Sequence, residues 1–371
     1  MQPIPERDLF PLPAQPDGVA WPTEEWETAT ASEVEGDSDR LDALLDELVS
    51  GEAHLVLGLT HAAAVVARGR LVAERYGKQT VRNLRSLGED PPLDDVGPDD
   101  ELLSWSMAKS LTHLAVGVAV GDGRLAVDEP VPEPQWAGAD DPRRSITWDD
   151  LLAMRPGLQW FEEYYDLAGE TPDVITMLFG DQAADMAAYA ASFPLVHEPG
   201  TVEAYNYSSG TTNIVAANLQ RALGLDRDGA EQFLRRRIFE PIGMTSARVD
   251  FDQAGTFVGS SYAYAALRDW CRFGLLAMRD GQWDGRRIVP DGWIAHGRTA
   301  RSWEDETLHG AHWWAWDADE MPFGAHGFEG QRIIAFPARD VIVVRLGKTA
   351  DESSTQLDAH LAAIAACFPE L

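Results

Sequence analysis

Apolar and polar positions recur with helical spacing over much of the chain. Leucines at positions 41, 44, 45 and 48 follow the i, i+3, i+4, i+7 pattern of an amphipathic helix, with Asp37 or Ser38 as its cap. Further helices are predicted from Ser106 to near Val120 and over residues 146–154, 183–191, 212–223, 230–239, 267–278 and 354–367. The middle of the chain is therefore expected to be mostly helical.

Strand-forming runs lie toward the two ends of the chain. Residues 62–67 and 71–76 flank Arg68-Gly69-Arg70, which predicts a β-hairpin. Three aromatic or β-branched runs follow in the last third, at residues 312–316, 331–336 and 341–346. Strands at both ends with helices between them predict an α/β fold of the α+β type, in which an antiparallel sheet formed from N- and C-terminal strands is flanked by helices and carries an inserted, mostly helical lobe.

A length of 371 residues exceeds one compact core. We expect an extended, Pro-rich N-terminal arm over residues 1–36 and a sheet lobe formed from residues 37–105 and 245–371. Residues 106–244 are expected to form the helical lobe. The cleft between the two lobes is the natural place for an active site.

Charge and cysteine content narrow the classes of partner and compartment. The net charge of −31 would repel nucleic acid and anionic membranes. Cys271 and Cys367 lie in apolar, helix-like contexts, which favours buried free thiols over a disulfide. Residues 1–17 lack the basic and apolar regions of a signal peptide, and no apolar run approaches the ~18 residues of a membrane span. A cytoplasmic protein is the expectation.

The strongest chemical candidate is the pair Ser106 and Lys109. Serine at i and lysine at i+3 share one helix face. A serine hydroxyl needs a base to attack a carbonyl, and lysine serves only if burial or a nearby cation lowers its pKa from about 10.4. The apolar residues that follow Lys109 suggest a buried helix. The alternative is an ordinary helix start with Ser106 as its N-cap.

Two further segments carry candidate chemistry. Tyr207 lies in a turn rich in serine and glycine, where a neighbouring ammonium would lower the pKa of its phenol from about 10 and allow proton transfer. The Gly-rich segment 324–331 stands at the mouth of a strand, where a backbone N–H could complete an oxyanion hole. The alternatives are a surface turn and a hairpin corner, with His326 a ring bonded to backbone.

Seven segments in register resemble the serine β-lactamase-like superfamily, which includes penicillin-binding proteins, class C β-lactamases and related esterases. The likeness covers roughly residues 55–350 and is strongest to hydrolases of the 6-aminohexanoate-dimer hydrolase type. The matching segments are Ser104–Ser110, Thr147–Leu158, Glu198–Asn213, Phe239–Met244, Gly255–Tyr262, Arg268–Gly274 and His326–Gln331.

The resemblance implies a role for each matching residue. Ser106 resembles the acylated nucleophile, Lys109 its lysine partner, and Tyr207 the tyrosine of the Tyr-x-Asn motif. The backbone N–H groups of Ser106 and Phe328 would form the oxyanion hole. The expected substrate-binding residues are Ser209, His326 and Gly327, together with Tyr164 and Tyr165 of the acidic, aromatic loop 158–166. No metal or cofactor is implied.

Two departures from the family pattern bear on activity. Ala325-His326-Gly327 stands where β-lactam enzymes have Lys-Thr-Gly, and Ser209 stands where asparagine is frequent. Both favour a small ester or amide as substrate, so a carboxylesterase or a 6-aminohexanoate-oligomer amidase is expected. β-Lactamase or D-amino-acid peptidase activity is one alternative, and a catalytically silent binding protein on the same fold is another. A homodimer is left open.

Other patterns carry less weight. His309 and His312 have a metal-like spacing but lack the His-Glu-x-x-His pattern. Residues Glu162 to Tyr165 are most simply a solvated loop. The alternative is that this loop closes over the substrate and its carboxylates favour an amine-bearing one.

Overall fold

The computed structural model describes residues 4, 8–50, 56–80, 93–163, 171–304 and 307–371. An antiparallel sheet of eight strands in the order β10-β11-β12-β13-β14-β15-β1-β2 forms its centre. The strands are β1 Leu59–Ala67, β2 Arg70–Tyr76, β10 Ser302–Glu304, β11 Thr307–His309, β12 Trp314–Ala315, β13 Phe323–Gly327, β14 Gln331–Phe336 and β15 Val341–Lys348. The predicted sheet built from both ends of the chain is thereby confirmed.

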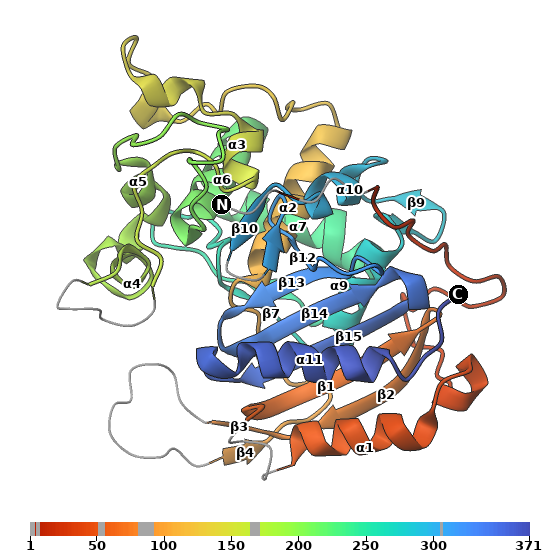
Figure 1. Ribbon diagram of the computed structural model, residues 1–371. Helices are drawn as coiled ribbons and strands as arrows, with labels where there is room; N and C mark the ends of the chain where they lie inside the picture. Colours follow the sequence, from red (N-terminus) through yellow and green to blue (C-terminus); the bar gives the residue numbers. More distant parts are fainter. Residues whose placement is uncertain (1–3, 5–7, 51–55, 81–92, 164–170, 305–306) are drawn as a thin grey trace.

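Helices lie on both sides of this sheet, and further helices connected by long loops lie beyond one end of it (Figure 1). They are α1 Ser38–Val49, α2 Met107–Gly121, α3 Trp148–Leu152, α4 Asp173–Phe179, α5 Met186–Ala191, α6 Ser209–Leu223, α7 Arg227–Leu234, α8 Glu240–Ile242, α9 Leu267–Met278, α10 Trp293–Arg298 and α11 Ser354–Ala365. Short strands pair outside the main sheet: β3 Lys78–Thr80 with β4 Leu93–Asp95, β5 Leu102–Leu103 and β6 Arg248–Val249 with β7 Ala263–Ala265, and β8 Gln282–Trp283 with β9 Arg286–Arg287.

Alternate residues of β1 serve two separate cores. Val65 and its neighbours at positions 63 and 67 pack with leucines of α1 and α11. Val66 and the alanines at 62 and 64 belong to the larger core that contains α2 and α9. Because successive side chains of a strand point to opposite faces, the continuous apolar run 62–67 fits a strand covered on both sides. Figure 1 shows α11 and α1 on one side of the sheet.

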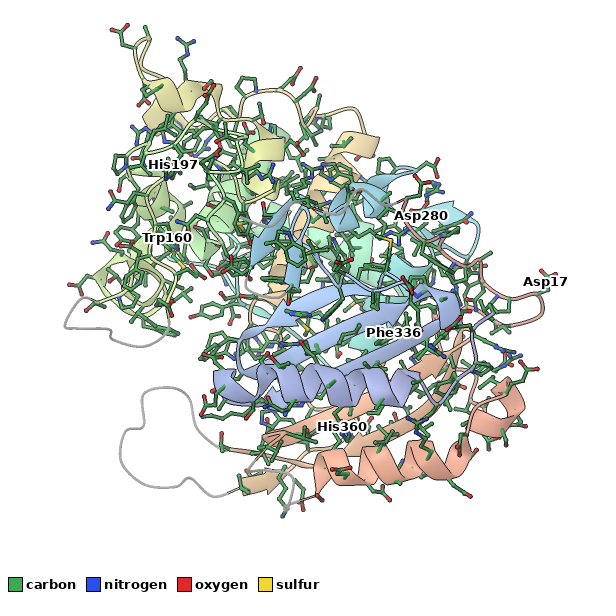
Figure 2. All side chains as sticks on the ribbon, viewed as in Figure 1. Asp17, Trp160, His197, Asp280, Phe336 and His360 are labelled. Atoms are coloured by element: carbon green, nitrogen blue, oxygen red, sulfur yellow. The ribbon has the colours of Figure 1, made fainter. Side chains whose placement is uncertain are left out.

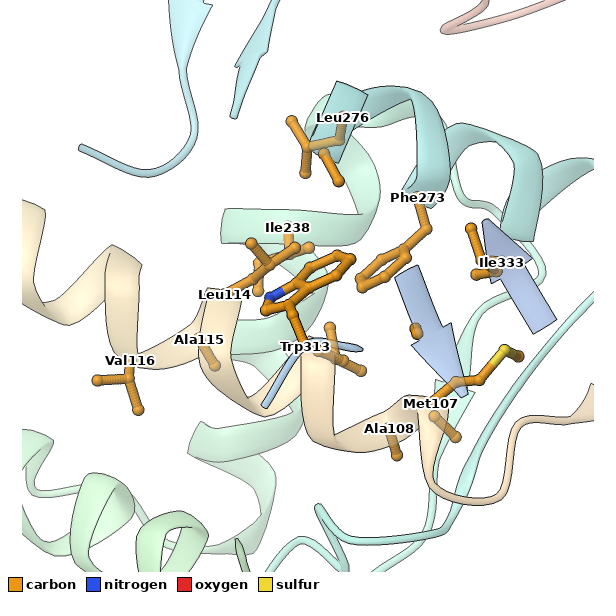
Figure 3. Packing of buried hydrophobic residues seen from close by; sticks show 14 of the residues in the cluster. Met107, Ala108, Leu114, Ala115, Val116, Ile238, Phe273, Leu276, Trp313 and Ile333 are labelled. Atoms are coloured by element: carbon orange, nitrogen blue, oxygen red, sulfur yellow. The ribbon is translucent and has the colours of Figure 1, made fainter. Parts of the chain in front are cut away.

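Helix α2 runs through the larger core, and Figure 3 shows apolar side chains along α2 together with Trp313 and Phe273. Trp313 stacks on Phe273 of α9 with ring centroids 5.9 Å apart. Its indole N–H also donates to Nδ1 of His113 on α2, at 3.1 Å. Residues Met107 to Ala119 of α2 are all buried, so the position of the helix start is set by packing on several sides.

The N-terminal segment is bound by arginines of α9 and α10 and by the arginine that follows α9. Arg272, Arg279 and Arg298, each at most 6% exposed, donate to backbone carbonyls of Pro22, Pro13 and Phe10. The prediction of a wholly extended arm is wrong at Ala31–Val34, which form a 3₁₀ helix. Thr30 and Glu33 form a reciprocal capping box there, which stabilises a helical turn.

Other departures from the predicted elements are local. The helix expected over 183–191 is divided into a 3₁₀ turn, Asp181–Ala184, and α5, because Asp185 leaves the helical conformation and caps α5. The helix expected over 230–239 begins at Arg227 and becomes a π-helix over Arg235–Phe239. The strand expected over 312–316 is limited to β12, since His312 has a φ of 61°.

Cys271 and Cys367 are both buried free thiols, as expected. Within the described ranges, no helix combines the length and apolar character that a membrane crossing requires. The division into an arm and two lobes at residues 37, 106 and 245 stays a prediction.

Candidate active site

Ser106 stands immediately before α2, as its N-cap, yet it does not cap the helix with its side chain. Its hydroxyl lies instead 2.8 Å from Nζ of Lys109, one turn further along α2. The residue before it, Trp105, has a φ of 45°. Such a conformation is strained for a bulky side chain and tends to occur at functional sites. The structure therefore favours the serine–lysine pair over the simple helix cap.

Lys109 is a buried amine without a carboxylate in direct contact among the described residues. Its side chain is 2% exposed, and Nζ donates to Oγ of Ser209 at 2.9 Å and to the carbonyl of Ser260 at 3.1 Å. Burial lowers the pKa of Lys109 to about 8, against an opposing pull from the nearby Glu162 carboxylate. A lysine with this pKa has a usable neutral fraction near neutral pH.

Tyr207 borders the same pair. Nζ of Lys109 lies 4.8 Å from the centroid of the Tyr207 ring, and the phenol is hydrogen-bonded with Ser106. The expectation of a lowered pKa is wrong, because burial raises the pKa of Tyr207 and outweighs the hydrogen bond with Ser106, which lowers it. Tyr207 is therefore a neutral phenol that can donate a proton, and it is poorly suited to accept one as a phenolate.

Ser209 lies behind the reactive pair. Its side chain is fully buried, and its hydroxyl donates to Oε1 of Glu162 at 2.5 Å while it accepts from Lys109. The interpretation of Glu162 as part of a solvated loop is wrong. Its carboxylate also accepts from the backbone N–H of Ser209 at 2.9 Å and from the indole N–H of Trp160 at 2.5 Å. The first turn of α6 and a half-buried indole supply donors that a carboxylate seeks.

A pocket of about 230 Å³ opens beside Ser106. It is bordered by Ser106, Glu162, Tyr207, Glu304, Trp314, His326, Gly327, Phe328, Glu329, Arg332 and Asp351, among others. Four of the residues expected to contact substrate or an oxyanion, Ser106 and the residues at positions 326 to 328, thus border the pocket, whereas Ser209 does not. Tyr164 and Tyr165 lie outside the described residues. Trp160, which precedes them, lies in the mostly helical part of the chain (Figure 2).

The last residues of β13 approach the start of α2 closely. A Cβ atom at Gly327 would lie 2.2 Å from the carbonyl oxygen of Ser104, so a larger residue would force the two segments apart. Phe328 follows directly and packs edge-on against Trp105, with centroids 5.8 Å apart. The backbone at Ser106 and at Phe328 thus belongs to two adjoining segments that border one pocket, which is the arrangement an oxyanion hole needs.

His326 forms part of an aromatic wall. It stacks on Trp314, with centroids 5.3 Å apart, and contacts Trp316 at 4.8 Å. Burial lowers the pKa of His326 well below 6.5, and its Nε2 atom has no hydrogen-bond partner within the described chain. The imidazole is therefore neutral where β-lactam enzymes place a lysine.

The pair His309 and His312 does not resemble a metal centre. Nδ1 of His312 donates to the carbonyl of Leu152 at 2.7 Å, and its Nε2 lies 3.0 Å from the hydroxyl of Thr212. Both ring nitrogens of His312 thus have hydrogen-bond partners. Within the part of the chain that the structure describes, no group of three or more His, Cys, Asp or Glu side chains could hold a metal ion.

The sequence singled out neither Glu304 nor Arg332 as a site residue, although both border the pocket. Arg332 donates to Asp358 at 2.8 Å and to Ser354 at 2.7 Å, so its charge is already partnered from α11. Glu304 and Trp314 sit on β10 and β12, strands of two or three residues. Runs this short have too little periodicity to be recognised in a sequence.

Comparison with known proteins adds to this geometry. A model of the protein family described as beta-lactamase matches residues 52–366. The 6-aminohexanoate-dimer hydrolase of Paenarthrobacter ureafaciens is 26% identical over 332 residues, which cover 84% of this chain and 78% of that protein.

Solved structures show the same fold at lower identity. A Bacillus anthracis protein provisionally described as a 6-aminohexanoate-dimer hydrolase superposes with a TM-score of 0.69 at 18% identity, covering 95% of this chain and 89% of its own. The octameric penicillin-binding protein homologue from Pyrococcus abyssi gives a TM-score of 0.64 at 18% identity, covering 89% and 77%.

Proposed function

Because the chain belongs to the beta-lactamase family, we propose that it is a serine hydrolase that cleaves a small ester or amide through an acyl-enzyme on Ser106. The observation that carries this proposal is the 2.8 Å contact between Nζ of Lys109 and Oγ of Ser106. A nucleophile and its base must lie within hydrogen-bond reach, and this pair does so at the edge of a pocket.

In the acylation step, neutral Lys109 takes the proton of the Ser106 hydroxyl as Oγ bonds to the substrate carbonyl carbon. The carbonyl electron pair moves onto the oxygen, where the backbone N–H groups of Ser106 and Phe328 would stabilise the charge. The position of Ser106 at the start of α2 favours this role, since the first N–H groups of a helix lack partners within it.

Collapse of the tetrahedral intermediate expels an alcohol or amine, which needs a proton. Tyr207 supplies it, because its phenol is neutral and adjacent to Ser106, and Lys109 then returns a proton to Tyr207. In the second step the same groups activate water, which releases the acid and restores Ser106.

The substrate class is narrowed by two features. A pocket of about 230 Å³ suits a small molecule. The neutral His326, where β-lactam enzymes have a lysine, removes a cation that would hold a β-lactam carboxylate, and Arg332 is already paired with Asp358. Both features support carboxylesterase activity or amidase activity on 6-aminohexanoate oligomers, of which the dimer is named for the Paenarthrobacter relative.

A substrate panel tests the proposal. Short-chain p-nitrophenyl esters, a 6-aminohexanoate dimer and a β-lactam are offered to the wild type and to Ser106→Ala. We expect the wild type to turn over an ester or the amide faster than the β-lactam, and the variant to turn over none. Preferred β-lactam hydrolysis would favour a β-lactamase or D-amino-acid peptidase. A wild type inert toward all three would favour the binding protein.

A further inference from the structure

We propose that Ser209 and Glu162 are positioning residues that hold the lone pair of neutral Lys109 toward Ser106. The inference rests on the proposed function, in which Lys109 is the base. It starts from a continuous set of contacts: Glu162 Oε1 to Ser209 Oγ at 2.5 Å, Ser209 Oγ to Lys109 Nζ at 2.9 Å, and Lys109 Nζ to Ser106 Oγ at 2.8 Å.

Counting protons fixes the direction of each hydrogen bond. A neutral amine has two N–H groups and one lone pair. The carbonyl of Ser260, 3.1 Å from Nζ, can only accept, so it takes one N–H. Ser209 has a single hydroxyl proton, and the Glu162 carboxylate, which also can only accept, takes it. Ser209 must then accept the second N–H of Lys109. The lone pair is left facing the hydroxyl of Ser106.

Glu162 is itself held in the orientation that this arrangement needs. Its Oε2 atom accepts from the indole N–H of Trp160 and from the backbone N–H of Ser209, the first residue of α6. Three donors thus converge on one carboxylate. An amide at this position would bring its own N–H₂ group against at least one of them.

Replacing Glu162 by glutamine should therefore reverse the direction of the hydrogen bonds from residue 162 through Ser209 to Lys109. With Oε1 of the glutamine on the Trp160 and Ser209 N–H groups, its amide N–H₂ donates to the Ser209 hydroxyl. The hydroxyl proton then points at Lys109 and competes with Ser106 for the lone pair. The exchange also removes a negative charge that raises the pKa of Lys109.

The first experiment measures acylation by a p-nitrophenyl ester across pH for the wild type, Glu162→Gln and Ser209→Ala. Glu163→Gln is the matched control, because Glu163 is the exposed neighbour with the same charge. We expect acylation to slow by about 10-fold to 100-fold in Glu162→Gln and Ser209→Ala. The acid limb of the pH profile should move to lower pH in Glu162→Gln. It should keep its position in Glu163→Gln.

The second experiment needs no catalysis. The chain contains only three lysines, Lys78, Lys109 and Lys348, so ¹³Cε-lysine NMR gives three titrating signals. Lys109→Met identifies the signal of Lys109. We expect its pKa to be lower in Glu162→Gln than in the wild type and unchanged in Glu163→Gln.

The two experiments separate the two proposals. If the wild type is not acylated, the proposed function fails, and the Lys109 titration alone decides the inference. A titration that is the same in Glu162→Gln and in the wild type overturns it, whatever happens to the rate. Wild-type acylation rates in both Glu162→Gln and Ser209→Ala would also overturn it.

Discussion

Lys109 contacts Ser106 through Nζ and Oγ at 2.8 Å, and the two residues lie one helical turn apart at the start of α2. Both residues are buried, and so is the helix from Met107 to Ala119. The chemistry of the contact depends on burial as much as on distance, since an exposed lysine would remain charged at neutral pH. Four expectations follow from this pair and from its surroundings.

Arginine at position 109 should abolish most of the activity. A guanidinium stays protonated throughout the accessible pH range and cannot accept the proton of Ser106. We expect Lys109→Arg to lower kcat/KM for a p-nitrophenyl ester by about 10²-fold to 10⁴-fold. The control is Lys78→Arg, at a half-exposed lysine that pairs with Asp95. Activity of Lys109→Arg within about tenfold of the wild type would exclude lysine as the base.

Activity should rise with pH through about 8. Burial lowers the pKa of Lys109 to about 8. Below that pH the amine is an ammonium without a lone pair, so kcat/KM should fall about tenfold for each pH unit on the acid side. A kcat/KM profile for an ester from about pH 6 to about pH 10 shows this limb. A flat profile, or one that falls as the pH rises toward 8, is inconsistent with Lys109 as the base.

Loss of the Tyr207 hydroxyl should depend on the leaving group. The phenol donates a proton because burial keeps its pKa above the ordinary value. An amine must be protonated to leave, whereas p-nitrophenolate leaves without a proton. We expect Tyr207→Phe to slow amide hydrolysis by about 10²-fold to 10³-fold and nitrophenyl ester hydrolysis by about tenfold or less. Equal losses with both substrates would point to a structural role.

Acid should destabilise the fold through buried histidines such as His312. Burial lowers the pKa of His312 to about 3, against about 6.5 in an unfolded chain. Between these values the unfolded chain holds a proton that the native state lacks. The contribution of His312 to the free energy of unfolding is therefore complete above about pH 6.5. It is lost at about 1.4 kcal/mol per pH unit as the pH falls below that value.

His312→Gln keeps one donor for Leu152 and one acceptor for Thr212. It should reduce the slope of unfolding free energy against pH by about 1.4 kcal/mol per unit between about pH 6 and about pH 4. Urea denaturation at several pH values measures the slope. The control is His197→Gln, at an exposed position in the mostly helical part of the chain (Figure 2). An unchanged slope in His312→Gln would contradict the lowered pKa of His312 in the folded protein.

The sequence was informative where a pattern is local. The hairpin of β1 and β2 follows from two apolar runs around Arg68 and Gly69, both of which adopt a positive φ in the turn. The start of α2 is marked by a change from acidic to apolar residues, and Ser106 and Lys109 meet because the helix period places them together.

The sequence was uninformative where contacts join distant segments. Glu162 and Ser209 are 47 positions apart, and neither shows a periodicity that predicts their hydrogen bond. Ser209 was expected at the substrate and is instead buried behind Lys109. Likewise, the pKa of Tyr207 depends on packing that no local pattern records, so the sequence does not predict that burial raises it.

The central claim is that Ser106 is acylated, and intact-protein mass spectrometry tests it most directly. The wild type and Ser106→Ala are each exposed briefly to a short-chain p-nitrophenyl ester and, separately, to a serine-directed phosphonate. We expect one covalent adduct on the wild type, located at Ser106 by peptide mapping, and none on the variant. An adduct of equal yield on Ser106→Ala, or an unlabelled wild type that leaves the ester intact, would contradict the account.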